Sequence, residues 1–568
     1  MTIKRAIPMP PTRPTNAHYP WVVLSNTTLG TLIVTINTSI LLISLPSIFR
    51  GLGIDPLAGG QSTFLLWILM GYMLVTAVLL VTCGRISDLY GRVRMYNLGF
   101  VVFTVFSLAL ALVPSVGIAG AMEILILRLF QGVGGAFLLA NSAALITDAF
   151  PAHRRGMAMG INQIAAIAGS LLGLLVGGVL SSLNWRLVFL VSVPIGIFGS
   201  IWAYLKLHQE ARQRESVSLD IPGNVTFALG LTLILVGITY GIQPYGKSVM
   251  GWGNPFVIGA IVIGLALLGW FVAIERRARE PLFRLDLFAV RAFAAGNIAG
   301  FTSSLARGGL QFILIIWLQG IWLPLHGYTY ADTPLWAGIY VAPMIVGFVI
   351  TGPLSGALSD RFGARAFSTI AMILSAGGFV LLSLLPGNFA PLPFFAILAF
   401  LGCAMGLFAA PNTTSIMNAA PAKMRGVASG MRATFQNAAT MASIALFFTL
   451  LTLGLAQNLP AVMRAGLISN GVPATTAASI AGLPPITALF AAFLGYNPMR
   501  TLIPAGLAAH LSAHETQTLF GTSFFPHLIL PAFMDGMHLA LWISAILSLV
   551  AAVASALRGK RYIAEKTS

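Results

Sequence analysis

The chain contains 568 residues, of which 57% are hydrophobic and 8% are charged, and its mean hydropathy is +0.89. So few charges cannot cover the surface of a water-soluble protein, which excludes the soluble classes and indicates a polytopic membrane protein. The net charge of +17 does not indicate a nucleic-acid partner, because the basic residues are scattered over short segments and form no basic stripe.

In chain order, a polar tail at residues 1–24 comes first, and it shows no cleavable signal peptide. A series of apolar segments follows. Each has about twenty residues, the length that crosses the hydrocarbon layer as a helix. The sequence predicts fourteen such spans, at residues 25–49, 62–83, 95–114, 121–147, 157–181, 187–206, 222–242, 254–274, 292–318, 335–357, 367–386, 393–417, 427–454 and 536–557.

The loops between these spans predict the orientation of the chain. If the N-terminus is inside, most of the 32 lysine and arginine residues fall in loops on the inner side. Cytoplasmic loops typically carry this excess of basic residues. We therefore expect a multi-pass protein of the cell inner (plasma) membrane, with both termini cytoplasmic and the lipid bilayer around it.

Two pairs of matching segments indicate an internal duplication. GRISDLYGRVR at 84–94 matches GALSDRFGAR at 356–365, and PAHRRGMAMG at 151–160 matches PAKMRGVASG at 421–430 at nearly the same offset. The offset places six spans in each half and an inserted pair between them. We expect an all-α membrane fold with a six-helix bundle at 25–206, an inserted pair with flanking cytoplasmic loops at 207–291, a second six-helix bundle at 292–557 and a cytoplasmic tail at 558–568.

Residues 455–535 depart from the short-loop pattern. Their apolar stretch is too short to span, and Pro484 and Pro485 interrupt the helix before it, so we expect interfacial or re-entrant packing on the outer face. His510 and His514 lack two further ligands, so no metal site is predicted. The two cysteines lie in apolar stretches and predict neither a disulfide nor a thiolate metal site.

The duplicated loop concentrates charge in a chain that has little of it. Its glycines let two helices turn back closely, Asp88 can accept hydrogen bonds from exposed helix amides, and Arg92 can pair with acids or carbonyls. We interpret the loop as a latch that forms in one arrangement of the two halves and breaks in another; the alternative is a solvated turn. The predicted latch residues are Gly84, Asp88, Gly91, Arg92, Gly356, Asp360, Gly363 and Arg365.

Ionisable residues within the membrane are costly and usually mark a pathway. Arg128 lies in the fourth span and Arg307 near the middle of the ninth, and the repeat offset relates Arg307 to the first span beside Asn37. Arg307 therefore lines a central cavity in our interpretation; the alternative is a structural arginine bonded to carbonyls and Gln311. The predicted cavity residues are Asn37, Trp67, Tyr72, Arg128, Gln131, Phe137, Asn297, Arg307 and Gln311, and the candidates for proton coupling are Glu123, Asp148, Asp535 and His538.

The motifs resemble those of a known family. GRISDLYGRVR resembles the loop signature of the major facilitator superfamily, and RLFQGVGGA at 128–136 resembles its fourth-helix signature. Fourteen spans with a central extra pair, together with NWRLVF at 184–189 and ASGMRATFQNA at 428–438, are similar to the drug:proton antiporter subfamily. The resemblance implies a secondary transporter that works by alternating access.

Two positions depart from that subfamily. Asn37 stands where its first-helix pattern has an aspartate, and Leu174 stands where its fifth-helix signature has a proline. An amide cannot carry a proton. Two deep arginines without a deep acid make the cavity neutral to positive, which repels a lipophilic cation.

We therefore expect an exporter of amphipathic small molecules that are neutral or anionic rather than cationic, with proton antiport as its energy source. The alternatives are a cationic multidrug exporter and a non-transporting membrane sensor or scaffold on the same fold. No motif of an enzyme appears, and we expect no cofactor and a monomer.

Overall fold

The computed structural model describes residues 18–58, 61–151, 154–208, 220–246, 248–278, 281, 283–421 and 424–559. Within these residues the chain is helical, and the only strand-like feature is one isolated bridge between Tyr245 and Ser248. Fourteen spans are long and apolar enough to cross a membrane, so the predicted all-α fold with fourteen spans is confirmed.

The spans are formed by single or broken helices: α1 (Tyr19–Leu52), α2 (Ser62–Tyr90), α3 (Arg92–Ala111), α4 (Gly117–Ala149), α5 (Arg155–Leu183), α6 with α7 (Leu187–Leu190, Ser192–Lys206), α8 (Ile221–Gly241), α9 (Pro255–Glu275), α10 with α11, the π-helical turn η2 and α12 (Arg291–Arg307, Leu310–Trp317, Leu318–Trp322, Leu323–Leu325), α13 (Thr333–Phe362), α14 (Ala364–Ser383), α15 (Pro391–Ala419), α16 (Arg425–Ile468) and α22 (Phe524–Ala556). A short 3-10 helix, η1 (Leu285–Ala289), precedes α10.

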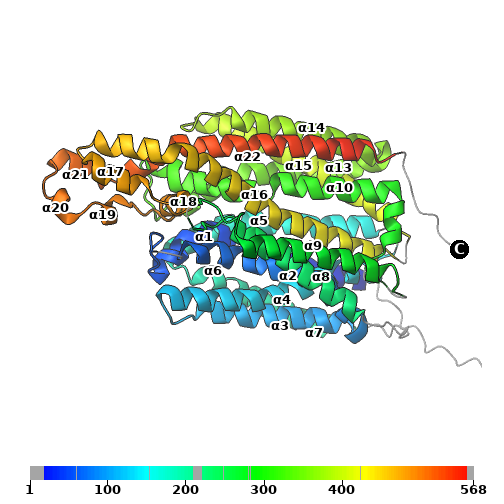
Figure 1. The fold of residues 1–568 in the computed structure, drawn as a ribbon. Helices are drawn as coiled ribbons and strands as arrows, with labels where there is room; N and C mark the ends of the chain where they lie inside the picture. The colour runs from blue at the N-terminus through cyan, green and yellow to red at the C-terminus, as the bar shows by residue number, and fades with distance from the viewer. Residues whose placement is uncertain are drawn as a thin grey trace, which may run out of the picture.

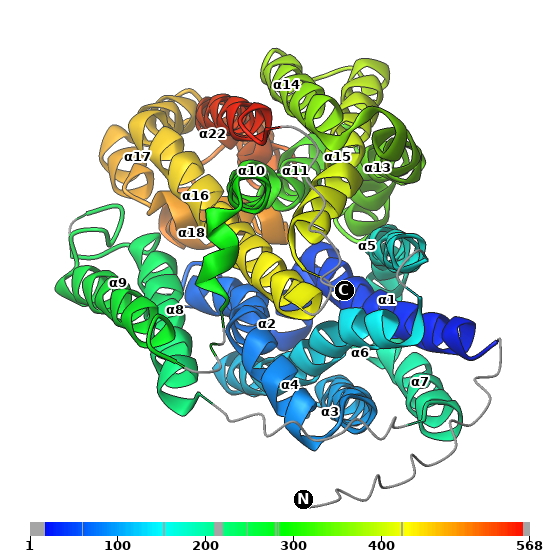
Figure 2. The ribbon, with the colours of Figure 1, turned by 90° about the vertical axis from the view of Figure 1, so that its right-hand side faces the viewer.

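The helices run side by side along one long axis (Figure 1). α1 begins and α22 ends at the same end of the molecule, which we call the terminal end; we call the opposite end the cap end. α1 to α7 pack on one another, as do α10 to α16 with α22, while α8 and α9 form a pair against α2 and α16 (Figure 2). Both copies of the duplicated loop lie at the terminal end.

Glycines bring α5 close to α1. A Cβ atom on Gly169, Gly173 or Gly177 would collide with Thr35, Ile36 or Ile40 of α1. Small residues at such positions let helix backbones approach each other in a membrane. Leu174, which replaces the expected proline, is fully buried in a continuous helix.

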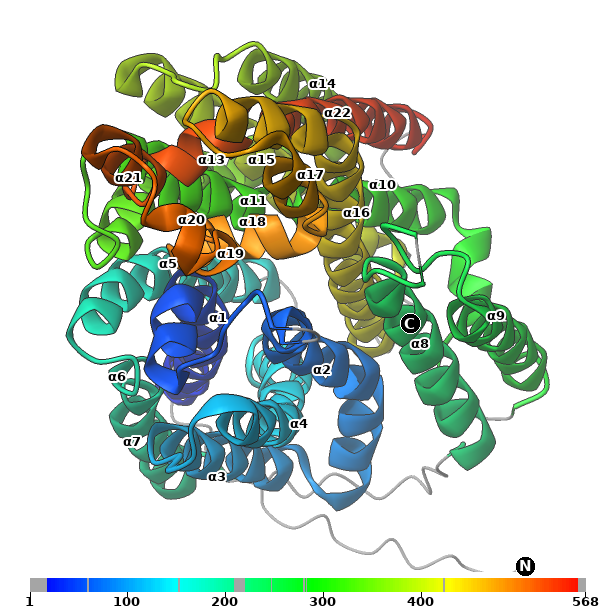
Figure 3. The same ribbon diagram turned by 60° about the vertical axis from the view of Figure 1, so that its left-hand side comes forward.

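Two helices extend past their predicted ends. α16 continues to Ile468 instead of residue 454, and α22 begins at Phe524 instead of residue 536. The helices α17 (Ala474–Ala481), α18 (Pro485–Leu494), α19 (Met499–Leu502), α20 (Ala505–Ala508) and α21 (Ala513–Leu519) lie between them. Figure 3 views this cap end.

α17 and α18 form a pair bent by 89° where the two prolines stand. Every residue of α18 except Thr487 is buried, and the helix contacts α1 and α2 as well as η2, α16 and α22. Its Phe493 backbone fits against Gly320 of η2, and its Phe490 ring lies 5.6 Å from Phe448 of α16. α18 therefore packs firmly on the second bundle while it covers the first.

Other contacts also join the two bundles at the cap end. A Cβ on Gly178 of α5 would collide with the backbone of Leu335 at the start of α13. The side chain of Gln319 donates a 3.1 Å hydrogen bond to the Ile43 carbonyl, and Arg50 donates one of 3.2 Å to the Tyr330 carbonyl. Among the described residues, these two hydrogen bonds are the ones that join a side chain of one bundle to the backbone of the other.

Candidate functional site

Arg128 lies at the centre of a buried polar cluster in the first bundle. It projects from α4 and is only 1% exposed. Its Nη1 donates to Asn37 Oδ1 of α1 and, over 2.6 Å, to Gln131 Oε1. The guanidinium lies 4.3 Å from the ring centre of Tyr72 on α2, and Gln131 in turn donates to Ser107 of α3 over 2.7 Å. Four helices therefore meet at this arginine.

All of these partners of Arg128 are neutral. Its Nε atom has no hydrogen-bond partner within the described part of the chain. Burying a charge without a counter-charge costs several kcal/mol, about as much as removing one partner of a buried ion pair. Such a charge in a membrane helix usually marks a pathway. The amide at position 37 orients this guanidinium but does not neutralise it.

Arg307 is the last residue of α10, in the middle of the span Arg291–Leu325. It is half-buried and makes no hydrogen bond or ion pair with the described residues. Gly300, two turns before it, faces Asn412 of α15 and Gln436 of α16. Gln311, one turn after it, also leaves its Nε2 without a partner. No hydrogen bond in the described part of the chain joins Arg307 to Gln311 or to a carbonyl.

A second arginine of the same bundle, Arg432 of α16, is held by neutral groups. Its Nη1 donates to Gln436 Oε1 over 2.8 Å and to Thr413 Oγ1 over 3.4 Å. Its Nε has no partner among the described residues. Both bundles therefore carry arginine side chains at membrane depth whose described partners are uncharged.

The other predicted cavity residues are divided among different surroundings. The Trp67 ring lies 5.8 Å from the Tyr240 ring of α8, which belongs to the inserted pair. Phe137 is 8% exposed and packs beside Cys83. Asn297 donates to the Phe293 carbonyl over 3.0 Å, and its Oδ1 has no partner. The structure thus gathers Asn37, Tyr72 and Gln131 around Arg128. Trp67, Phe137 and Asn297 have other neighbours.

Ser107 was not foreseen. Its hydroxyl receives the hydrogen bond from Gln131, and it is fully buried in α3. The available signal was its position as a polar residue in the middle of the apolar third span.

The first copy of the predicted latch contains an ion-paired trio, which we call the latch trio: Asp88, Arg92 and Asp148. Arg92 Nε lies 2.8 Å from Asp88 Oδ1, and its Nη1 lies 2.6 Å from Asp148 Oδ2. The trio joins the end of α2, the start of α3 and the end of α4. Asp148, expected to couple protons, therefore accepts from an arginine of the latch.

The second copy repeats the turn of the first. Gly91 and Gly363 have φ angles of 104° and 89°, a conformation that strains other residues, and each donates its N–H to a serine carbonyl four residues earlier. The side chain of Asp360 lies outside the described residues. Arg365 is exposed and has no described hydrogen bond or ion pair.

The remaining candidates for proton coupling lie near helix ends. Glu123 accepts a 2.7 Å hydrogen bond from Ser115 at the cap end of α4. Asp535 is exposed on α22 and accepts one of 2.6 Å from Asn458 of α16. His538 is half-buried and makes no bond with Asp535.

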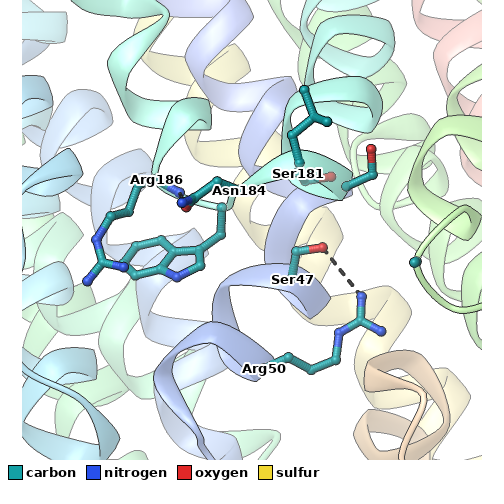
Figure 4. A pocket seen from close by; sticks show the side chains of 9 residues that line it. Ser47, Arg50, Ser181, Asn184 and Arg186 are labelled. Carbon is teal, nitrogen blue, oxygen red and sulfur yellow. Dashed lines mark hydrogen bonds between the residues drawn. The ribbon is translucent and has the colours of Figure 1, made fainter.

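A shallow cavity of about 310 Å³ opens at the cap end between the two bundles. Figure 4 shows its polar lining, in which Arg50 donates to Ser47 over 3.4 Å. Arg186 donates to the Val113 carbonyl over 2.9 Å and lies over the ring of Trp185. The lining contains two arginines and no acid; its residues are Ser47, Arg50, Ser181, Ser182, Leu183, Asn184, Trp185, Arg186 and Ala331.

Residues 27–221 and 221–444 each match the family model of the Major Facilitator Superfamily. The chain belongs to the Major Facilitator Superfamily. The chain is 27% identical to a riboflavin transporter of Clostridioides difficile, over 77% of this chain and 90% of that one. It is 26% identical to a multidrug transporter of Bacillus subtilis, over 87% and 86%. It is 27% identical to a tetracenomycin C resistance and export protein of Streptomyces glaucescens, over 73% and 72%.

Solved structures share the fold at lower identity. A bacterial homologue of the human lysosomal transporter Spinster aligns with a TM-score of 0.56 and 15% identity, over 96% of this chain and 98% of that one. A D-xylose–proton symporter aligns with a TM-score of 0.53 and 17% identity, over 84% and 97%. The predicted superfamily is confirmed, and two of these relatives are named as a multidrug transporter and a resistance and export protein. The chain is a multi-pass secondary transporter and belongs to a family of transporters, not of enzymes.

Proposed function

We propose that the protein exports amphipathic small molecules that are neutral or anionic, by proton antiport and alternating access. One observation carries the choice of substrate charge. Arg128 and Arg307 lie in the middle of their bundles, and neither has a carboxylate partner among the described residues. A cation would be repelled by both guanidinium groups and an anion attracted by both.

The alternating-access step is supported by where the bundles touch. Their described inter-bundle hydrogen bonds lie at the cap end, and α18 covers the same end. We interpret this arrangement as the state in which the central site is closed toward the cap end and faces the terminal end. Opening toward the cap end then requires that α18 moves with the second bundle, away from α1 and α2.

The orientation follows from the loop charges. If the terminal end lies on the cytoplasmic side of the plasma membrane, most basic loop residues also lie on that side. The latch trio then lies on the cytoplasmic side and holds the ends of α2, α3 and α4 together while the bundles move. Both bundles belong to one chain, so a monomer suffices.

Proton antiport is supported by the position of the titratable groups along the long axis. Glu123, Asp535 and His538 lie toward the cap end, and Asp148 lies at the terminal end. We assign them to the entry and the exit of the proton. Asn37 replaces the acid that would otherwise stand between these ends, so Arg128 has no carboxylate partner among the described residues around it.

Transport into inverted vesicles tests the substrate charge. Three fluorescent substrates of matched size with charges of −1, 0 and +1 are added with an imposed pH gradient. The neutral and anionic substrates should accumulate, and the cation should not. Arg307→Ala should lower anion uptake at least tenfold, because it removes one favourable charge interaction of roughly 3 kcal/mol at about 6 Å, and should leave neutral uptake nearly unchanged.

Two variants serve as controls. Arg307→Lys keeps the charge and should retain most anion uptake, while Arg464→Ala removes an exposed charge from the cap-end part of α16 and should have no effect. Uptake of the cation alone, unaltered by Arg307→Ala, would contradict the charge argument. Uptake that persists after an uncoupler collapses the gradient would contradict proton coupling only.

A further inference from the structure

Four helices of the second bundle form a small apolar layer near the terminal end. α10, α14, α15 and α22 contribute Ala299, Ala371, Met372, Phe408, Ala551 and Ala552 to it. Figure 2 shows these four helices from the terminal end. α14 begins at this end, whereas α15 and α22 finish there. The residues between the apolar layer and the terminal end therefore precede the layer in α14 and follow it in α15 and α22.

The residues one or two turns below this layer are polar and buried. Ser368 of α14 and Ser555 of α22 are fully buried, and Asn412 of α15 is 1% exposed. Arg558 follows Ser555 on the same face of the chain and is 3% exposed. Arg558 Nη2 donates to Asn412 Oδ1, which draws the guanidinium back into the bundle. We call Ser368, Asn412, Ser555 and Arg558 the polar layer.

The polar layer has more donors than acceptors. Arg558 Nε and Nη1, Asn412 Nδ2 and both serine hydroxyls lack hydrogen-bond partners among the described residues. No described carboxylate pairs with Arg558. Buried polar groups almost always have partners, so such a concentration of unpaired donors points to an absent ion or water.

Charge distinguishes an ion from water. Burial lowers the pKa of the Arg558 guanidinium to about 10, which leaves it charged at neutral pH. Water can satisfy the hydroxyl groups but cannot compensate a buried positive charge. Gly300 of α10 lets the Asn412 side chain approach closely, since a Cβ on Gly300 would lie 3.2 Å from Asn412 Nδ2.

We propose that the polar layer binds one small oxyanion, a phosphate or a carboxylate, with Arg558 as the residue that compensates its charge. A planar guanidinium with two free N–H groups and neighbouring hydroxyls matches oxyanion geometry. The site is separate from Arg128 and lies between α14, α15 and α22. It does not depend on the charge of the exported substrate.

The test measures the thermal unfolding of the purified full-length protein in detergent. Sodium phosphate or sodium acetate is raised from 1 to 100 mM at constant ionic strength, balanced with sodium chloride, whose anion lacks the oxygen atoms of an oxyanion. A ligand that binds only the folded state raises the unfolding midpoint with concentration, here by about 2–5 °C. Arg558→Gln should abolish the rise.

A matched control is Arg291→Gln. Arg291 lies at the same end, but it is exposed and its Nε donates to the Leu557 carbonyl. This variant should keep the full rise. If Arg558→Gln does not fold, Ser368→Ala with Ser555→Ala removes two donors without changing charge and should weaken the anion concentration dependence several-fold.

Native mass spectrometry separates the sources of the oxyanion. A bound inorganic phosphate, or a phospholipid that is lost in Arg558→Gln and kept in Arg291→Gln, would each support the site and identify its ligand. The proposal is overturned if no anion shifts the midpoint and no mass adduct depends on Arg558. An equal shift in Arg558→Gln and the parent overturns it as well.

Discussion

Replacing Gln319 with leucine should shift the transporter toward the state that is open at the cap end. Gln319 is fully buried in the π-helical turn η2, and its Nε2 donates a 3.1 Å hydrogen bond across the bundle interface to the Ile43 carbonyl. Its Oε1 has no described partner. Leucine is similar in size and apolar, so the change removes the inter-bundle bond without leaving a buried polar atom behind on residue 319.

The expected size follows from the single bond. A buried hydrogen bond contributes about 1 kcal/mol net, and this one exists only while the bundles touch at the cap end. Because 1.4 kcal/mol is tenfold in an equilibrium constant, the ratio of cap-open to cap-closed molecules should rise about fivefold. The central site and the latch trio are untouched by this substitution.

Spin-label distance measurements can detect this shift. Labels on Leu112→Cys and Leu384→Cys report the cap end, because these exposed residues cap α3 and α14 there. Labels on Tyr204→Cys and Leu557→Cys report the terminal end. In a background without the two native cysteines, the variant should gain a longer cap-end distance and a shorter terminal-end distance.

Gln311→Leu is the matched control. Gln311 lies in the same broken span, and no hydrogen bond joins its side chain to the other bundle among the described residues. It should leave both distance distributions as in the parent. Unchanged distributions in Gln319→Leu, or an equal shift in the control, would refute the assignment of this bond to the cap-end closure.

Three further predictions concern other parts of the chain. Asn37→Asp should place a carboxylate beside Arg128 and lower anion uptake at least tenfold relative to neutral uptake, measured as initial rates in inverted vesicles. Asp88→Asn should slow transport several-fold at unchanged protein level, because the latch trio keeps its second carboxylate; equal transport would exclude a gating role. Hydrogen bonds from Ser512 hold the pKa of Glu515 below its ordinary value of 4.5, so its stabilisation of α21 is present above that pH and lost as pH falls through the lowered pKa. Glu515→Gln should therefore speed hydrogen exchange of residues 513–519 at pH 7, with the difference shrinking as the pH falls through the lowered pKa of Glu515.

The sequence predicted the spans well because a membrane leaves the backbone few choices. A lipid-facing helix satisfies its own N–H and C=O groups, so about twenty apolar residues suffice to predict one. The same approach misplaced the ends of α16 and α22. Hydropathy marks where the bilayer would end, whereas these two helices continue beyond it to Ile468 and from Phe524.

The site was predicted only in part, for a related reason. The glycine turns at Gly91 and Gly363 follow from local backbone geometry, and the sequence contains them directly. The pairing of Arg92 with Asp148 joins residues 56 positions apart, which spacing alone does not reveal. The packing of Trp67 against the inserted pair could not be predicted from the sequence. Its helix is apolar on all sides and offers no polar face to indicate which neighbour Trp67 meets.

If Arg128 and Arg307 line the central site as we propose, its charge outweighs the shape of a substrate in deciding what it accepts. At about 6 Å from one guanidinium and an effective dielectric constant near 20, a unit charge gains or loses roughly 3 kcal/mol. The difference between an anion and a cation is then roughly 6 kcal/mol, as much as about seven buried methylene groups contribute at 0.8 kcal/mol each. Greater lipophilicity therefore cannot rescue a cation of the same size. A single carboxylate next to Arg128 would cancel this difference, and Asn37 already occupies the position from which it would act.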